Sequence, residues 1–227
     1  MRRWLPVAVA VVCLFVCPVQ SSAQTWVPFG TAYWAAGAGQ SGGNGLVTDS
    51  QTCVVNPVTC PWGTTYGGAE LVGGPTDPTA LTSISFSYKP NVSGAGGGAP
   101  RLVIEFSDGG SADLRPLNWT AGVWELVDGL TLSGNAGWDN NGGTCGYVYN
   151  TSWAVVLTCH AGASITSTFL VNDAGWLHDP EQVILDGANI NGIVFGATKD
   201  ACKKGGYVAL GFPNQGQCVS SFVSNKP

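Results

Sequence analysis

The segment Ile84-Ser85-Phe86-Ser87-Tyr88 alternates apolar and polar residues without a break. Successive side chains of a β-strand point to opposite faces of its sheet, so the pattern predicts one buried face and one solvated face. Arg101–Phe106 is expected to form another strand. The Asp108-Gly109-Gly110 segment then predicts a hairpin turn, because glycine supplies the positive φ that such turns need. Ser111–Leu117 is expected to return as the following strand.

Short apolar segments separated by turn residues continue on both sides of this region. The only helix expected is a short one at Lys199–Lys204. Short strands joined by turns are typical of a sandwich or jelly roll rather than of alternating strands and helices. We therefore predict an all-β fold, a β-sandwich or jelly roll over residues 24–196. The further strands expected are Ala69–Val72, Val123–Val127, Leu130–Ser133, Cys145–Tyr149, Trp153–Cys159, Ile165–Val171, Val183–Leu185 and Ile190–Phe195, with Cys145–Tyr149 and Trp153–Cys159 forming a hairpin.

Residues 1–23 have the pattern of a secretory signal peptide. Arg2 and Arg3 form a short basic region, Leu5–Val16 is apolar, and Ser21-Ser22-Ala23 supplies the small residues that signal peptidase recognises. The apolar segment is shorter than the about 20 residues of a membrane span. We therefore expect cleavage after Ala23 and secretion to the cell exterior, with a retained membrane anchor or a lipid anchor as the alternatives.

Charge excludes two classes of partner. The chain has nine basic and 14 acidic residues, and loss of Arg2 and Arg3 with the signal peptide would leave seven basic residues and a net charge of −7. The longest basic cluster of the remaining chain is Lys203-Lys204. Nucleic acids and anionic membranes both attract clustered positive charge, so neither is expected as a partner of the mature chain.

Six cysteines follow residue 23, and an even number in a secreted chain indicates disulfides. The spacing favours three local bridges in chain order. Zinc is the weaker alternative, because the sequence has no Cys-x-x-Cys pair and only two histidines. The expected pairs are Cys53 with Cys60, Cys145 with Cys159, and Cys202 with Cys218.

Residues 197–227 hold most of the lysines and are expected to form an appendage too short to bury a core of its own. They contain Lys199-Asp200-Ala201-Cys202-Lys203-Lys204-Gly205-Gly206-Tyr207 and Gly211-Phe212-Pro213-Asn214-Gln215-Gly216-Gln217-Cys218-Val219. Together these segments resemble a tail of secreted bacterial proteins of unassigned function, with a departure at Tyr207, where tryptophan is usual. The resemblance implies a secreted bacterial protein and no particular activity.

A second resemblance concerns Val183-Ile184-Leu185-Asp186-Gly187-Ala188-Asn189-Ile190-Asn191-Gly192. This segment resembles the last strand of galactose-binding-like jelly rolls, which occur as carbohydrate-binding modules. The resemblance implies a structural calcium that ties the last strand to an early one. Asp186 fits the late position of such a calcium site, and Glu70 is our assignment for the early position.

The sequence shows no complete catalytic constellation. A serine triad needs a histidine base held by a carboxylate, and no Gly-x-Ser-x-Gly elbow is present. We expect His160 at a surface turn and His178 in a loop. A glycosidase needs two carboxylates across a cleft, and Glu105 and Glu125 are the candidates. A solvated strand face is the simpler interpretation of both glutamates, which favours a non-catalytic protein.

Eight tryptophans follow residue 23, and several lie beside polar segments that read as loops. Flat aromatic rings hold the apolar faces of sugars, and neighbouring Asp or Asn side chains bind the hydroxyls. Core packing is the alternative for each tryptophan, and it is the one expected for Trp153. The predicted ligand-binding residues are Trp119, Trp138, Asp139, Asn140 and Trp176, with Asp139-Asn140-Asn141-Gly142-Gly143 expected as a turn.

These features favour a secreted, extracellular, non-catalytic binding module for carbohydrate or another cell-surface ligand. The alternatives are a polysaccharide-active enzyme that uses paired carboxylates and a structural cell-surface protein. Apart from the structural calcium, no cofactor is expected.

Overall fold

The computed structural model describes residues 25–35, 37–40, 44–50, 66–91, 100–132, 135–173, 181–195, 203 and 214–221. The expected signal peptide lies outside these residues, as does most of the expected C-terminal appendage, including all of the helix expected at its start except Lys203. The expected bridges of Cys53 with Cys60 and of Cys202 with Cys218 also lie outside what is described.

The described chain is built mainly of strands. They are β1 (Thr25–Gly30), β2 (Ala32–Ala35), β3 (Gly45–Ser50), β4 (Tyr66–Val72), β5 (Ile84–Pro90), β6 (Arg101–Phe106), β7 (Ser111–Pro116), β8 (Glu125–Asp128), β9 (Ala136–Gly142), β10 (Gly146–Thr151), β11 (Ile165–Asp173), β12 (Glu181–Ile190) and β13 (Ile193–Val194). The helical segments are the 3₁₀ turn η1 (Pro78–Ala80), α1 (Trp153–Cys159) and α3 (Gln215–Ser221).

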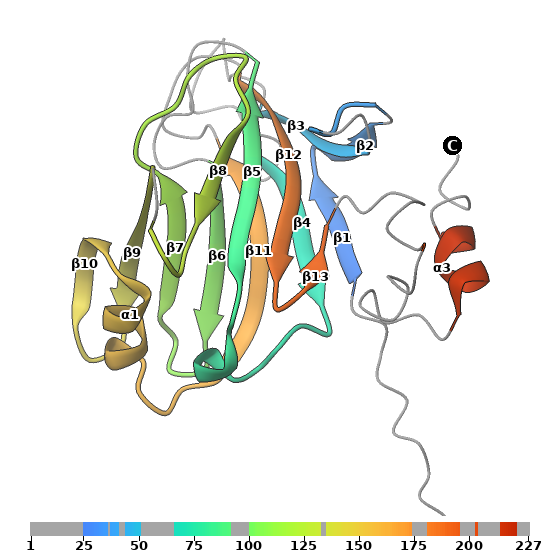
Figure 1. The fold of residues 1–227 in the computed structure, drawn as a ribbon. Helices are drawn as coiled ribbons and strands as arrows, with labels where there is room; N and C mark the ends of the chain where they lie inside the picture. Colours follow the sequence, from blue (N-terminus) through green and yellow to red (C-terminus); the bar gives the residue numbers. More distant parts are fainter. Residues whose placement is uncertain are drawn as a thin grey trace, which may run out of the picture.

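The strands form two antiparallel sheets that pack face to face, which confirms the predicted β-sandwich (Figure 1). The seven-stranded sheet has the order β1-β4-β11-β6-β7-β9-β10. The six-stranded sheet has the order β2-β3-β12-β5-β8, with β13 paired to β12. Strand β10 therefore forms one edge of the larger sheet, and α1 lies beside it.

Alternation along the strands builds the core between the sheets. On β5, Ile84, Phe86 and Tyr88 are buried and face the interior, as the sequence predicts. Leu102 and Ile104 of β6 are buried from the opposite sheet. Burial of each large apolar side chain stabilises the fold by about 1.5–3 kcal/mol, so this shared layer holds the sheets together.

The expected strand at Trp153–Cys159 is wrong, because this segment is helix α1. Its buried residues are Trp153, Val156 and Cys159, spaced at the helical period, and Ser152 precedes them in an extended conformation suited to a helix start. The neighbouring β-branched Val155 and Val156 favour a strand by propensity. The packing of one helical face on the core overrides that preference.

Two further expectations are corrected. Leu130–Leu132 forms a turn rather than a strand, because the Asp128 carboxylate accepts hydrogen bonds from the backbone N–H groups of Leu130 and Thr131, at 2.9 and 3.0 Å. Residues 139–142, expected as part of a turn, belong to strand β9, which pairs with both β7 and β10.

The predicted bridge between Cys145 and Cys159 is confirmed, with the two Cα atoms 5.2 Å apart. It joins the start of β10 to the end of α1 rather than the two strands of a hairpin. Beside it, the backbone N–H of Thr144 donates to the carbonyl of Cys159 at 2.8 Å. The disulfide thus fixes the β9–β10 turn against the helix.

We predict that the paired substitution of Cys145→Ala with Cys159→Ala lowers the free energy of unfolding by about 3 kcal/mol. The bridge restricts the unfolded chain, and its removal gives the unfolded state back the conformational entropy of a loop of this length. Urea unfolding followed by tryptophan fluorescence measures the change. Cys145→Ala alone should give a similar loss. Wild-type stability in the double variant would contradict this account of the bridge.

Candidate functional site

The most exposed aromatic side chains among the described residues lie on the edge strand β10. Tyr147 and Tyr149 are 68% and 67% exposed. Because they are two residues apart on a strand, both project from the same face of the sheet. Their rings are nearly parallel, with centroids 6.3 Å apart and an interplanar angle of 22°. We refer to these two residues as the tyrosine pair.

The tyrosine pair projects from the outer face of the seven-stranded sheet. Tyr147 is directly opposite Asn141 of β9, and Asn141 is exposed, whereas its neighbour Asn140 is buried between the sheets. Helix α1 packs on the inner side, where Trp153 contacts the buried Trp138 with ring centroids 4.8 Å apart. The tyrosine pair and α1 therefore lie on opposite sides of the same hairpin.

The turn that joins β9 to β10 is stabilised by the buried side chain of Asn140. The Asn140 side-chain amide donates to the carbonyl oxygens of Gly142 and Gly146, at 3.0 and 2.8 Å. Gly143 adopts a positive φ of 62°, and a Cβ there would lie 2.4 Å from the carbonyl oxygen of Cys159. Only glycine fits at this position, so the turn and the end of α1 can approach closely.

The opposite end of β10 is fastened by Asp139. Its carboxylate accepts a hydrogen bond from the backbone N–H of Asn150 at 2.9 Å and from Nε of Arg115 at 2.5 Å. Arg115 also donates to the side-chain oxygen of Asn150 at 2.9 Å. Asn150 has a positive φ of 52° at an irregularity in the β9–β10 pairing. Both ends of the strand that carries the tyrosine pair are therefore fixed.

A row of polar side chains extends from Tyr147 across the outer face. Cross-strand partners place these residues directly opposite one another from β11 to β10. Neighbouring strands lie about 4.8 Å apart, so the row extends over about 19 Å. We call it the polar row, and its members are Ser167, Glu105, Ser111, Asn141 and Tyr147.

A network of paired charges lies beside the polar row. Arg101 donates two hydrogen bonds to Asp173, at 2.7 and 2.6 Å, and its Nε lies 3.5 Å from Asp113. Asp113 faces Asp139 directly across the β7–β9 pairing. Burial raises the pKa of Asp113 to about 6, since the cost of desolvating its carboxylate exceeds the attraction of Arg101. The arginines thus stabilise a face that carries more acidic than basic groups.

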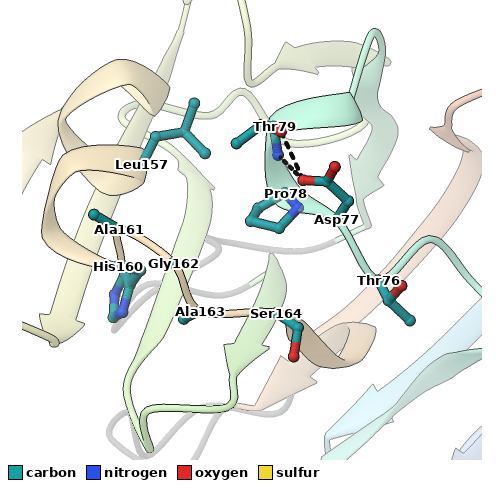
Figure 2. A pocket seen from close by; sticks show the side chains of 10 residues that line it. All are labelled: Thr76, Asp77, Pro78, Thr79, Leu157, His160, Ala161, Gly162, Ala163 and Ser164. Carbon is teal, nitrogen blue, oxygen red and sulfur yellow. Dashed lines mark hydrogen bonds between the residues drawn. The ribbon is translucent and has the colours of Figure 1, made fainter.

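A hollow of about 470 Å³ lies elsewhere, between η1 and the end of α1, with walls that include Pro78, Thr79 and Leu157 (Figure 2). His160 borders it but is 2% exposed, so the expectation of a surface turn is wrong. Its imidazole stacks on Phe106, with centroids 4.0 Å apart, and Nδ1 lies 2.8 Å from Asp108. The ring is thereby held beneath the end of α1.

The Asp108–His160 pair matches two members of a hydrolytic triad, but its third member is missing from the described residues. Nε2 of His160 is buried and has no hydrogen-bond partner there. Burial opposes ionisation of Asp108, yet the hydrogen bond with His160 holds the pKa of Asp108 below its ordinary value. Among the described residues, no hydroxyl forms a hydrogen bond with Nε2 of His160. The hydrogen bond between Asp108 and His160 links the end of α1 to the β6–β7 turn.

Strand alternation separates the predicted constellation of Trp138, Asp139 and Asn140. Trp138 is completely buried, and its Nε1 donates to the carbonyl of Gly129 at 2.7 Å. Asn140 is 1% exposed, and only Asp139 faces outward. Neither Trp138 nor Asn140 offers a surface to a ligand in this fold. Trp119 is 41% exposed in the loop before β8, and Trp176 lies outside the described residues.

The two candidate catalytic carboxylates are not brought together. Glu105 is exposed on β6 in the seven-stranded sheet, whereas Glu125 is on β8 in the six-stranded sheet. Glu125 accepts hydrogen bonds from the hydroxyl of Tyr88 and from the backbone N–H of Thr120, at 2.9 and 2.8 Å. These hydrogen bonds stabilise the β7–β8 loop.

The proposed calcium ligands are separated in the same way. Glu70 is exposed on β4 of the seven-stranded sheet. Asp186 is on β12 of the six-stranded sheet, where its carboxylate accepts hydrogen bonds from the backbone N–H groups of Gln40 and Gly187, both at 2.7 Å. A single ion cannot contact both residues. In the part of the chain that the structure describes, no group of three or more His, Cys, Asp or Glu side chains is arranged to hold a metal ion.

Sequence reasoning missed the tyrosine pair, although the signal was present. Tyr147-Val148-Tyr149 lies in a segment that was expected to be a strand, so alternation already places the two tyrosines on one face. What the sequence lacks is the information that β10 forms a sheet edge and that this face points to solvent.

Comparison with known protein families, with curated protein sequences and with solved structures finds no match to this chain. The structure itself therefore defines the class, which is an antiparallel β-sandwich. Among the described residues, no helix has both the length and the apolar character that crossing a membrane requires.

We predict that Asp113→Asn stabilises the protein near neutral pH. Because the pKa of Asp113 is raised to about 6 in the folded chain, the stability that its protonation contributes is complete below its ordinary pKa of 3.8 and is lost as the pH rises through about 6. The variant should be more stable than wild type by about 1–3 kcal/mol at about pH 7.5, and nearly equal at about pH 4. Urea unfolding at both pH values measures this difference.

The matched control is Asp139→Asn, which leaves Arg115 without its carboxylate and should destabilise the protein at about pH 7.5. Equal destabilisation by Asp113→Asn at that pH would contradict the account of Asp113.

Proposed function

We propose that this chain is a secreted, non-catalytic carbohydrate-binding module whose binding surface is the tyrosine pair with the polar row beside it. The observation that carries the proposal is the exposure of two adjacent, nearly parallel tyrosine rings on a rigid strand. Aromatic side chains usually bury their area, so two open rings side by side favour a ligand that covers them.

The chemistry of the surface suits a sugar. A pyranose has an apolar C–H face that packs on an aromatic ring and hydroxyls at its rim that need hydrogen-bond partners. The tyrosine pair supplies the rings, and Asn141, Ser111 and Glu105 supply amide, hydroxyl and carboxylate groups in line with them. A tyrosine side chain also presents a large contact area at a low cost in conformational entropy.

The rigidity of the hairpin supports binding without rearrangement. The disulfide between Cys145 and Cys159 fixes one end of the hairpin, and the hydrogen bonds of Asp139 fix the other. Binding to a preorganised surface costs less free energy than binding to one that must first become ordered. The disulfide also suits an oxidising compartment, which agrees with the secretion expected from residues 1–23.

The catalytic alternative has less support. Glu105 and Glu125 are on different sheets, and Glu125 is occupied by structural hydrogen bonds. The Asp108–His160 pair has no nucleophile in contact with it among the described residues. A binding role needs none of these groups.

The proposal predicts that Tyr147→Ala and Tyr149→Ala each weaken carbohydrate binding by about tenfold, and that the double variant abolishes it, since each loses a stacking surface. Affinity electrophoresis of the oxidised protein through gels containing soluble polysaccharides measures the change. The structural control is far-UV circular dichroism, which should be unchanged because both side chains are exposed.

The matched control variant is Tyr33→Ala. Tyr33 is 49% exposed but lies on β2, in the other sheet, so its removal should leave binding unchanged. Binding that survives the double variant, or that is lost in Tyr33→Ala, would overturn the proposed surface. The absence of binding to every polysaccharide tested would overturn the function itself.

A further inference from the structure

We infer that the ligand of this surface is an uncharged polysaccharide, which lies along the polar row, and that Glu105 excludes anionic chains. The inference rests on the proposed function and adds the chemical class of the sugar. It follows from which charged groups of this face are paired with an opposite charge and which are not.

The cations of this face are already neutralised. Among the described residues of β6, β7, β9, β10 and β11, the only basic side chains are Arg101 and Arg115. Arg101 is bound by both carboxylate oxygens of Asp173, and Arg115 is bound to Asp139 and to the side-chain oxygen of Asn150. An anionic sugar would have to displace one of these carboxylates. Sulfate and uronate groups therefore find no free cation in this part of the face.

The polar row carries one charge that is not neutralised. Glu105 is exposed and makes no hydrogen bond or ion pair within the described chain. It lies between Ser167 and Ser111 in the row, two strands from Asn141. A free carboxylate accepts hydrogen bonds from sugar hydroxyls and repels another carboxylate or a sulfate. The same residue thus favours a neutral chain and disfavours a charged one.

The shape of the surface fits a polymer better than a single sugar. The polar row extends about 19 Å across five strands, with its hydrogen-bonding groups at the strand spacing and an aromatic ring at one end. A chain that packs on Tyr147 and continues toward Ser167 passes over Glu105. An anionic chain bound in this way would bring one of its charged groups close to Glu105, which repels it.

The test compares pairs of polymers that share a backbone, one with neutral and one with anionic substituents or side groups. Suitable probes are hydroxyethylcellulose with carboxymethylcellulose, and neutral xylan with glucuronoxylan, each in affinity electrophoresis at low salt. Wild-type protein should bind the neutral member of at least one pair about tenfold or more tightly than its anionic partner. Added salt should reduce this difference, because it screens exposed charges.

Two substitutions separate the role of Glu105 from the charge of the face as a whole. Glu105→Gln should bring the binding of the anionic polymer close to that of the neutral one, because it removes the charge and keeps an oxygen that can accept a hydrogen bond from a sugar hydroxyl. Glu70→Gln removes the same charge from an exposed position on β4, outside the polar row, and should leave the discrimination as in wild type.

Each outcome decides one point. Equal or tighter binding of the anionic polymers by wild type would overturn the inference while the proposed function stands. Discrimination that persists in Glu105→Gln would overturn the role of Glu105. Failure to bind either member of any pair would overturn both the inference and the proposed function.

Discussion

The buried indole of Trp138 connects the two sheets at the edge of the sandwich that carries the tyrosine pair. Trp138 belongs to β9 of the seven-stranded sheet, and its Nε1 donates to the carbonyl of Gly129, next to β8 of the six-stranded sheet. A Cβ at Gly129 would lie 2.8 Å from the indole, so glycine is required for this approach. With Trp138 fixed inward, Asp139 and Asn141 must face outward, because a slip of one residue would reverse every side chain of the strand.

The outer face then follows from the register. Asn141 sets the position of Tyr147, and Asp139 holds the far end of β10 through Asn150 and Arg115. Paired charges make this face polar and neutralise Arg101 and Arg115, and the aromatic area of the described face is concentrated at its edge. A surface of this composition is suited to a ligand with both apolar faces and many hydroxyls. The stability of the fold and the proposed binding surface thus depend on the same hairpin, because its inner side completes the core and its outer side presents the tyrosines.

The sequence predicts the sandwich because alternation such as that of Ile84–Tyr88 indicates both the strand and which of its faces is buried. It also predicts the bridge of Cys145 with Cys159 from spacing. It does not predict α1, since Val155 and Val156 favour a strand locally and only packing against Trp138 decides for the helix. The sequence does not predict β9 either, because residues 139–142 are polar and read as a turn. Asn140 is nevertheless buried, since its side chain makes hydrogen bonds to the turn rather than apolar contacts.

The most direct test of the proposed binding surface is chemical-shift mapping of the ¹⁵N-labelled, oxidised protein with a short neutral oligosaccharide taken from a polymer that slows its migration in affinity electrophoresis. The account predicts that the largest shifts occur at Tyr147, Tyr149 and Asn141, and that they extend to Ser111 and Glu105 along the polar row. Shifts confined to the hollow beside Leu157, or to the loop that holds Trp119, would contradict it.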